Sequence, residues 1–246
     1  MVDAGNAGGQ EADAAVERIL AYAPILDIDR VAVGSNAVFQ AVLQGPEGDL
    51  LAIYKPARGE RPLWDFPDRT LHRREVATFV VDRALGWGFS PVTVLRSEAP
   101  FGVGSMQAYV PEPPPGLEID RQQLEHQLRG LAALDVVINN ADRKRAHILI
   151  DPEGGIKGID HGVTFNTEFK LRSALVELGG SPVPPEWLQG VRALLDDAKR
   201  LRRLRERLRP LLTRSEVTAF ERRSSQLLAS GLFPSVHPFY GRPFEW

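Results

Sequence analysis

The chain has 246 residues, of which 43% are hydrophobic and 25% charged, so it can bury the core of one large domain or of two lobes. Its net charge of −2 provides no global positive field, and we therefore expect no nucleic-acid partner. The absence of cysteine excludes disulfides and cysteine-ligated zinc.

The first half of the chain alternates short apolar segments with glycine and proline turns. Residues 1–14 lack the basic start and apolar core of a secretory signal, so we interpret them as a flexible leader. No apolar run approaches the roughly 18 residues of a membrane helix, and we expect a cytoplasmic protein. Periodicity predicts these elements up to residue 110: a helix over 12–23, strands within 31–43 and over 50–54, a helix over 70–85, and strands over 91–95 and 105–110.

A proline-rich stretch, PEPPPG, separates this region from a mostly helical one. Beyond it the pattern predicts a helix over 121–137, a hairpin with strands over 147–150 and 156–159, and helices over 185–209 and 214–230. We therefore expect an α+β chain with a small β-rich N-lobe at 15–111, a linker at 112–116 and a mostly helical C-lobe at 117–246.

The segment 139–162 carries the residues best suited to chemistry. Asp142 opens a polar loop, His147 begins a strand five residues later, and Asp160 ends the returning strand. The hairpin brings His147 and Asp160 to one edge, where a carboxylate and a second ligand can hold Mg²⁺ or Mn²⁺ against nucleotide phosphates. Asp142 is then placed to orient or deprotonate an attacking hydroxyl. The alternative is a hairpin with ordinary turn aspartates.

Two motifs in this segment resemble the phosphatidylinositol 3-/4-kinase superfamily, whose signature is D-R-H-x-x-N, a hairpin, and I-D-F-G. They are Asp142-Arg143-Lys144 with His147, and Ile159-Asp160-His161-Gly162. More of the chain, including YKPARGERPLWDFP and NNADRK, is similar to a bacterial group within that superfamily.

This resemblance implies a two-lobed protein-kinase-like fold that uses ATP with Mg²⁺ or Mn²⁺. Asp142 matches the catalytic aspartate and Asp160 the metal-binding aspartate. His147 stands where the family has a metal-binding asparagine, and imidazole suits Mn²⁺ better than the harder Mg²⁺. His161 replaces the phenylalanine of D-F-G.

The resemblance also assigns roles in the N-lobe. Lys55 ends an apolar strand, where a half-buried lysine is costly unless it is paired. In kinase-like folds such a lysine contacts the α- and β-phosphates and pairs with a helix glutamate, for which Glu75 is the best candidate. The alternative is an ordinary lysine at a strand end.

Further nucleotide contacts are expected from two backbone segments. The turn at Ser35 and Asn36 could cover phosphate oxygens, although a plain hairpin fits it equally. The resemblance places the adenine edge against backbone groups near Tyr109 and Val110. Next to Asp142, the basic pair Arg143 and Lys144 either steadies phosphate charge or is solvated loop charge.

We therefore predict an ATP- and metal-dependent phosphotransferase acting on protein Ser/Thr hydroxyls, including its own. Thr164, Thr167 and Ser173 are candidate modification sites after Asp160. A phosphoinositide or small-molecule kinase is the first alternative. A nucleotide-binding pseudokinase scaffold is the alternative from another class, and transfer of AMP in place of phosphate is a third.

Overall fold

The computed structural model describes residues 4–31 and 36–235, with side chains described from residue 12 onward. Two compact units emerge: Met1–Val76 with Pro91–Tyr109, and Ala77–Ser90 with Val110–Trp246. In the part of the chain that is described, no helix combines the length and apolar composition required to cross a bilayer.

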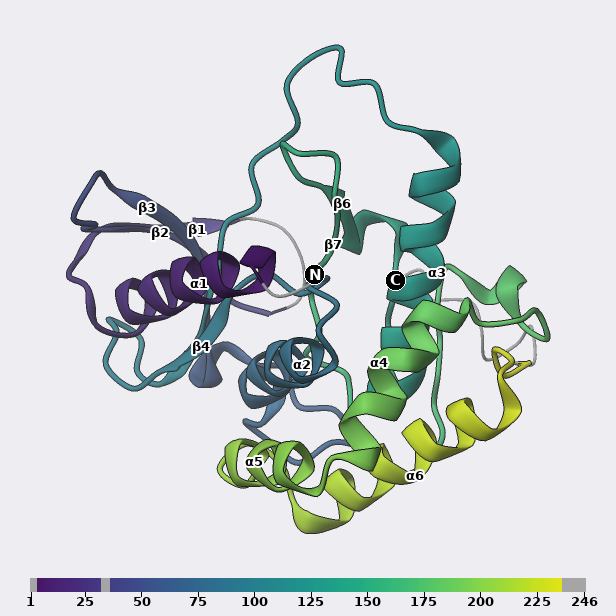
Figure 1. Ribbon diagram of the computed structural model, residues 1–246. Coiled ribbons are helices and arrows are strands. Elements are labelled where there is room, and N and C mark those ends of the chain that lie inside the picture. The colour runs from purple at the N-terminus through teal and green to yellow at the C-terminus, as the bar shows by residue number, and fades with distance from the viewer. Residues whose placement is uncertain (1–3, 32–35, 236–246) are drawn as a thin grey trace. The chain divides into compact units, whose positions relative to one another are not determined.

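The first unit is built around a five-stranded antiparallel sheet in the order β1-β2-β3-β5-β4. Helix α1 (Ala4–Tyr22) packs on β4 and β5 (Figure 1). The core strands alternate buried and accessible residues, as expected for a sheet covered on one face. The strands are β1 (Ile25–Val31), β2 (Val38–Leu43), β3 (Leu50–Pro56), β4 (Thr93–Arg96) and β5 (Gly104–Ala108).

The second unit is mostly helical, and its centre is the second half of α3. Residues 130–138 of this helix are all buried. In Figure 1, α6 lies beside α3, and α4 lies beside α5 and α6. The helices that belong wholly to this unit are α3 (Arg121–Ile138), α4 (Pro185–Asp196), α5 (Ala198–Leu208) and α6 (Arg214–Ser230).

A short hairpin packs on α3 in the second unit. Its strands, β6 (Ile148–Ile150) and β7 (Ile156–Gly158), pair antiparallel as the turn signal predicts. The Asp151 carboxylate closes the turn by accepting the N–H groups of Glu153 and Gly155. A single 3-10 turn, η2 (Arg145–His147), leads into β6.

Three predicted boundaries were wrong. The helix over 185–209 is two helices, because Asp197 leaves the helical conformation and its carboxylate caps α5 through the N–H groups of Lys199 and Arg200. The first strand begins at Ile25, well before the predicted residue 31. Helix α1 begins at Ala4, within the stretch interpreted as a leader, where the alanines favour helix.

Helix α2 (Leu71–Leu85) begins where Glu60 binds its first turn. The Glu60 carboxylate accepts the N–H groups of Leu71 and His72, at 3.0 and 2.7 Å, and pairs with the buried His72 ring at 2.6 Å. A carboxylate at a helix N-terminus is stabilising because it satisfies unpaired N–H groups. This contact fixes the first turn of the helix that carries Glu75.

Candidate active site

The loop that carries Asp142 is positioned by the end of α3. Asn139 adopts the left-handed conformation (φ 54°) and ends the helix. The Asn140 side chain then bridges the two elements: its Nδ2 donates to Asp135 Oδ1 at 2.9 Å, and its Oδ1 accepts the Asp142 N–H at 3.0 Å. Because Asn140 is fully buried, these bonds fix the backbone of Asp142.

Asp142, His147 and Asp160 lie together in the second unit. One ligand atom from each lies within 4.8 Å of the others. His147 Nε2 is 3.3 Å from Asp160 Oδ2, and Lys144 Nζ is 3.0 Å from Asp142 Oδ2. The Asp160 carboxylate and the His147 imidazole form a donor pair suited to a divalent cation, and the Asp142 carboxylate lies beside them.

The ring of His147 is oriented for ligation. Its Nδ1 lies 3.1 Å from the carbonyl oxygen of Asp142, which can only accept, and 3.5 Å from the backbone nitrogen of Lys144, which can only donate. The shorter contact favours a proton on Nδ1, which leaves the Nε2 lone pair toward Asp160. Burial lowers the pKa of His147, although the Asp160 carboxylate opposes this shift. A neutral imidazole whose other nitrogen is held by a carbonyl is the usual form of a metal ligand.

Asp160 has an uncommon backbone conformation. Its φ is +60°, and its carboxylate is about half exposed. Aspartate tolerates the left-handed region better than most residues, but that conformation is still costly and tends to occur at functional sites. The turn directs the chain from β7 into the segment that follows.

Arg143 is a structural residue at the centre of this region. It was expected either to contact phosphate or to be a solvated loop charge, and both expectations were wrong. Its side chain is fully buried and forms a forked ion pair with Asp135, with Nη2 to Oδ1 at 2.9 Å. Its Nη1 donates to the carbonyl oxygens of His147 (3.2 Å) and Ile159 (2.8 Å). Arg143 thus connects α3 to the residue before β6 and to the residue after β7.

The residue that follows Asp160 completes this cluster. His161 is fully buried, and its Nε2 accepts from Arg143 Nη2 at 2.7 Å. Gly158 permits this approach, since a Cβ there would lie 3.1 Å from Arg143 Nη2 and 2.8 Å from a Leu131 methyl. We assign His161 to the architecture of the hairpin.

Asp135 was not among the predicted site residues. It is the buried partner of Arg143, Asn140 and Ser173. The available signal was an aspartate inside the apolar helical run LAALDVVI, because a carboxylate there needs several donors.

In the first unit, Lys55 pairs with Glu75. Lys55 Nζ is 2.5 Å from Glu75 Oε1, and the side chains are 19% and 3% exposed. Strand β3 positions the lysine next to Ser105 of β5, and α2 supplies the glutamate. In this pair the lysine side chain remains partly accessible, whereas the glutamate is buried.

The residues predicted to contact the nucleotide through turn and backbone groups do not form one cluster with the residues above. Ser35 lies outside the described residues. Asn36 Oδ1 accepts the Arg61 N–H at 2.7 Å, so this side chain holds a neighbouring loop. The Tyr109 N–H donates to Leu51 O, so a nucleotide edge would have to meet other backbone groups near Tyr109 and Val110.

Comparison with known sequences gave one clear relative, although no family model matches the chain. The Mycobacterium tuberculosis protein Rv2133c is 34% identical over an alignment of 264 positions, which covers 93% of each protein.

Comparison with solved structures shows the fold. The structure of hydra Fam20 with sugar has a TM-score of 0.63 at 15% identity and covers 88% of each chain. The Golgi casein kinase with Mn/ADP bound has a TM-score of 0.62 at 17% identity, covering 93% of this chain and 77% of that one. The Helicobacter pylori proinflammatory kinase CtkA has a TM-score of 0.53 at 9% identity, covering 87% and 94%. The predicted α+β, two-lobed kinase-like fold is therefore confirmed.

Proposed function

This chain belongs to the same family as the Mycobacterium tuberculosis protein Rv2133c, and we propose that it is an ATP- and divalent-metal-dependent phosphotransferase acting on protein hydroxyl groups. The observation that carries the proposal is the cluster of Asp142, His147 and Asp160 within 4.8 Å in a kinase-like fold. As part of the same proposal, residues 15–111 act as the nucleotide-covering lobe and 117–246 as the catalytic lobe of a cytoplasmic enzyme.

Asp160 and His147 would hold the metal ion. Their fit rests on the donor set and on the orientation of the ring, whose Nε2 faces the Asp160 carboxylate at 3.3 Å. When bound, such an ion neutralises charge on the nucleotide phosphates. An imidazole ligand favours Mn²⁺ over Mg²⁺, and the solved structure of the Golgi casein kinase contains Mn and ADP.

The other residues act on the substrates. Asp142 would orient the acceptor hydroxyl and take its proton, with its carboxylate held by Lys144 at 3.0 Å. Lys55 would contact the nucleotide phosphates while Glu75 fixes its position. Catalysis would then consist mainly of positioning and charge stabilisation.

The class of molecule that accepts the phosphate is a separate part of the proposal. Two of the solved neighbours are named as kinases, one of them a casein kinase, and this supports a protein acceptor. The narrower likeness to phosphatidylinositol 3-/4-kinases rests on the two motifs around Asp142 and Asp160. Phosphoinositides are therefore the second acceptor to test.

The proposal is tested by incubating the pure protein with ATP labelled at the γ-phosphate and Mn²⁺. Label should enter the protein or an added casein, and should be lost in Asp142→Ala and Asp160→Ala. The matched control is Asp49→Ala, an exposed turn aspartate outside both motifs. Equal labelling in Asp142→Ala would contradict the assignment. Nucleotide binding without any transfer would indicate a pseudokinase, and label entering only from the α-phosphate would indicate AMP transfer.

A further inference from the structure

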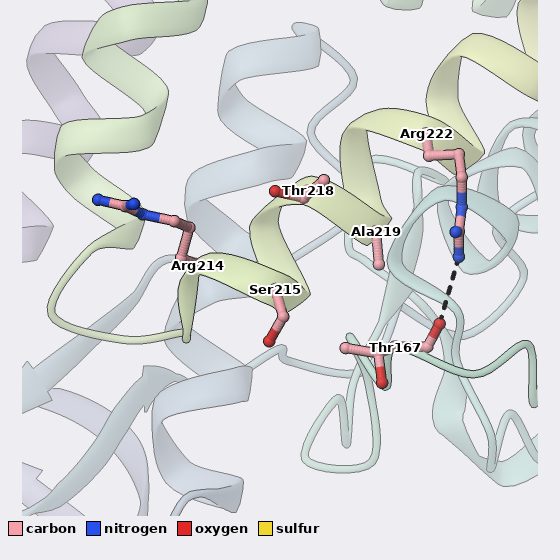
Figure 2. A pocket seen from close by; sticks show the side chains of 6 residues that line it. All are labelled: Thr167, Arg214, Ser215, Thr218, Ala219 and Arg222. Carbon is pink, nitrogen blue, oxygen red and sulfur yellow. Dashed lines mark hydrogen bonds between the residues drawn. The ribbon is translucent and has the colours of Figure 1, made fainter.

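A hollow of about 680 Å³ lies along the first turns of α6 (Figure 2). Two guanidinium groups and three hydroxyl groups line it, and no carboxylate is among the lining side chains. The lining residues are Thr167, Arg214, Ser215, Thr218, Ala219 and Arg222. Guanidinium and hydroxyl groups are donors for an anion with several acceptor oxygens, such as a phosphate group.

One of the hydroxyls belongs to the segment that follows Asp160. Of the three candidate hydroxyls in that segment, Thr164 is fully buried and donates to His161 O at 2.8 Å. Ser173 is 5% exposed and donates to Asp135 at 3.3 Å. Thr167 is exposed. It can therefore accept a new group without disturbing the buried network.

The backbone on both sides of Thr167 is fixed. Asn139 Nδ2 donates to the carbonyl oxygens of Asn166 (2.9 Å) and Glu168 (2.6 Å), and Arg223 Nη1 donates to Asn166 O at 3.1 Å. A group attached to Thr167 would be held near α6 with little further ordering of the chain.

Of the two arginines that line the hollow, Arg222 lies nearer to Thr167. Figure 2 shows it reaching from α6 toward Thr167, with Nη2 3.5 Å from the Thr167 carbonyl oxygen, whereas Arg214 extends away at the other end of the hollow. The long contact is weak, so the guanidinium can move to a stronger acceptor at little cost. A phosphate on Thr167 would supply three such oxygens and a charge of about −1.5 to −2.

We propose that Thr167 is a phosphorylation site and that this hollow, chiefly through Arg222, binds its phosphate and fixes the segment after Asp160 to α6. That the protein itself transfers this phosphate from ATP rests on the proposed function. Thr167 Oγ attacks the γ-phosphorus of ATP, the new Oγ–P bond forms and the bond to the β,γ-bridging oxygen breaks. ADP leaves, and the Asp142 carboxylate takes the hydroxyl proton.

Binding of the phosphate is tested without using the protein's own activity. Phosphothreonine is incorporated at position 167 during translation of the full chain, in the parent, in Arg222→Gln and in Arg209→Gln. Arg209 is an exposed arginine near α6 that does not line the hollow. The phosphate should raise the unfolding midpoint by about 2–4 °C in the parent and in Arg209→Gln, and the gain should be lost in Arg222→Gln. An equal gain in Arg222→Gln, or no gain in the parent, would overturn the proposal.

A second arm tests the source of the phosphate. The unmodified chain is incubated with ATP and Mn²⁺ and its phosphorylated residues are mapped by mass spectrometry. Phosphate should appear on Thr167 and not on Thr164 or Ser173. Phosphate only at other positions overturns the assignment of Thr167. If no phosphate is incorporated but the installed phosphothreonine still stabilises through Arg222, the hollow stands as a phosphate site and the proposed enzymatic function fails.

Discussion

Two ion pairs in this protein differ in how deeply they are buried and in how many groups they join. Arg143 and Asp135 are 0% and 1% exposed, and the guanidinium also donates to two carbonyl oxygens and to His161. Lys55 and Glu75 share one short contact, and the lysine keeps 19% of its side chain accessible. A guanidinium with five fixed donors suits an architectural junction, whereas a lysine whose side chain is partly accessible can also contact a ligand. A basic residue next to a motif aspartate is therefore not evidence of a phosphate contact.

Removing Arg143 should have the largest effect on stability. Arg143→Gln leaves the Asp135 charge buried without its partner and should lower the free energy of unfolding by about 3–5 kcal/mol. Arg143→Lys should also destabilise, since one ammonium cannot replace the forked contacts. Denaturant unfolding measures this, with the exposed neighbour Arg145→Gln as control. A decrease in the free energy of unfolding of less than about 1 kcal/mol would contradict the architectural role of Arg143.

Removing both members of the other pair should separate activity from stability. Lys55→Met with Glu75→Gln leaves no buried charge at this position, so its stability should stay within about 1 kcal/mol of the parent. Phosphate transfer should fall by about 100- to 1000-fold, the usual cost of losing one preorganised charged donor. Full transfer activity in the double variant would contradict the role of Lys55.

A third buried carboxylate, that of Asp82, differs from those of Asp135 and Glu75 because it accepts hydrogen bonds from backbone N–H groups. It accepts the Ser90 N–H at 2.8 Å, and burial raises its pKa to about 7. The folded state therefore binds this proton more tightly than the unfolded state, so stability should fall as pH rises from about 4 to 7. The expected loss between pH 5 and 7 is about 2 kcal/mol. Urea unfolding should show that the free energy of unfolding of Asp82→Asn lacks this pH-dependent loss. If the variant kept the same dependence on pH as the parent, the assignment of the loss to Asp82 would be contradicted.

The smallest effect concerns the choice of metal. His147→Asn introduces the asparagine that the resemblance to phosphatidylinositol 3-/4-kinases implies at this position, and it replaces an imidazole nitrogen with an amide oxygen at the proposed metal site. The ratio of activity with Mg²⁺ to activity with Mn²⁺ should rise by about tenfold, because hard Mg²⁺ prefers oxygen. His126→Asn, in the first half of α3 and paired with Glu186 at 3.2 Å, should leave the ratio unchanged. Complete loss of activity with both ions would show a separate role for the imidazole.

The local parts of the fold and the site were predictable. A proline-glycine turn between two short apolar runs predicted the β6–β7 hairpin, and the hairpin explains why His147 and Asp160 lie together. The functional roles of Asp142, His147, Asp160 and Lys55 remain predictions. Other features depend on contacts distant in the chain, which periodicity does not report. The partnership of Arg143 with Asp135 and the exposure of Thr167 beside Thr164 are of this kind.

The break between α4 and α5 was missed for a different reason. Residues on both sides of Asp197 have helical periodicity, and a cap inside a periodic run is easily interpreted as a surface aspartate. Its carboxylate nevertheless satisfies two N–H groups at the start of α5, which a continuous helix would not need.

The most direct test of the central claim is the binding of Mn²⁺ with a non-hydrolysable ATP analogue, measured by calorimetry on the parent, Asp160→Asn and Asp142→Asn. If Asp160 holds the metal and Asp142 acts on the acceptor, Asp160→Asn should lose metal-dependent binding by about 10- to 100-fold. Asp142→Asn should bind like the parent but fail to transfer phosphate from ATP. Binding by Asp160→Asn equal to that of the parent would contradict the account.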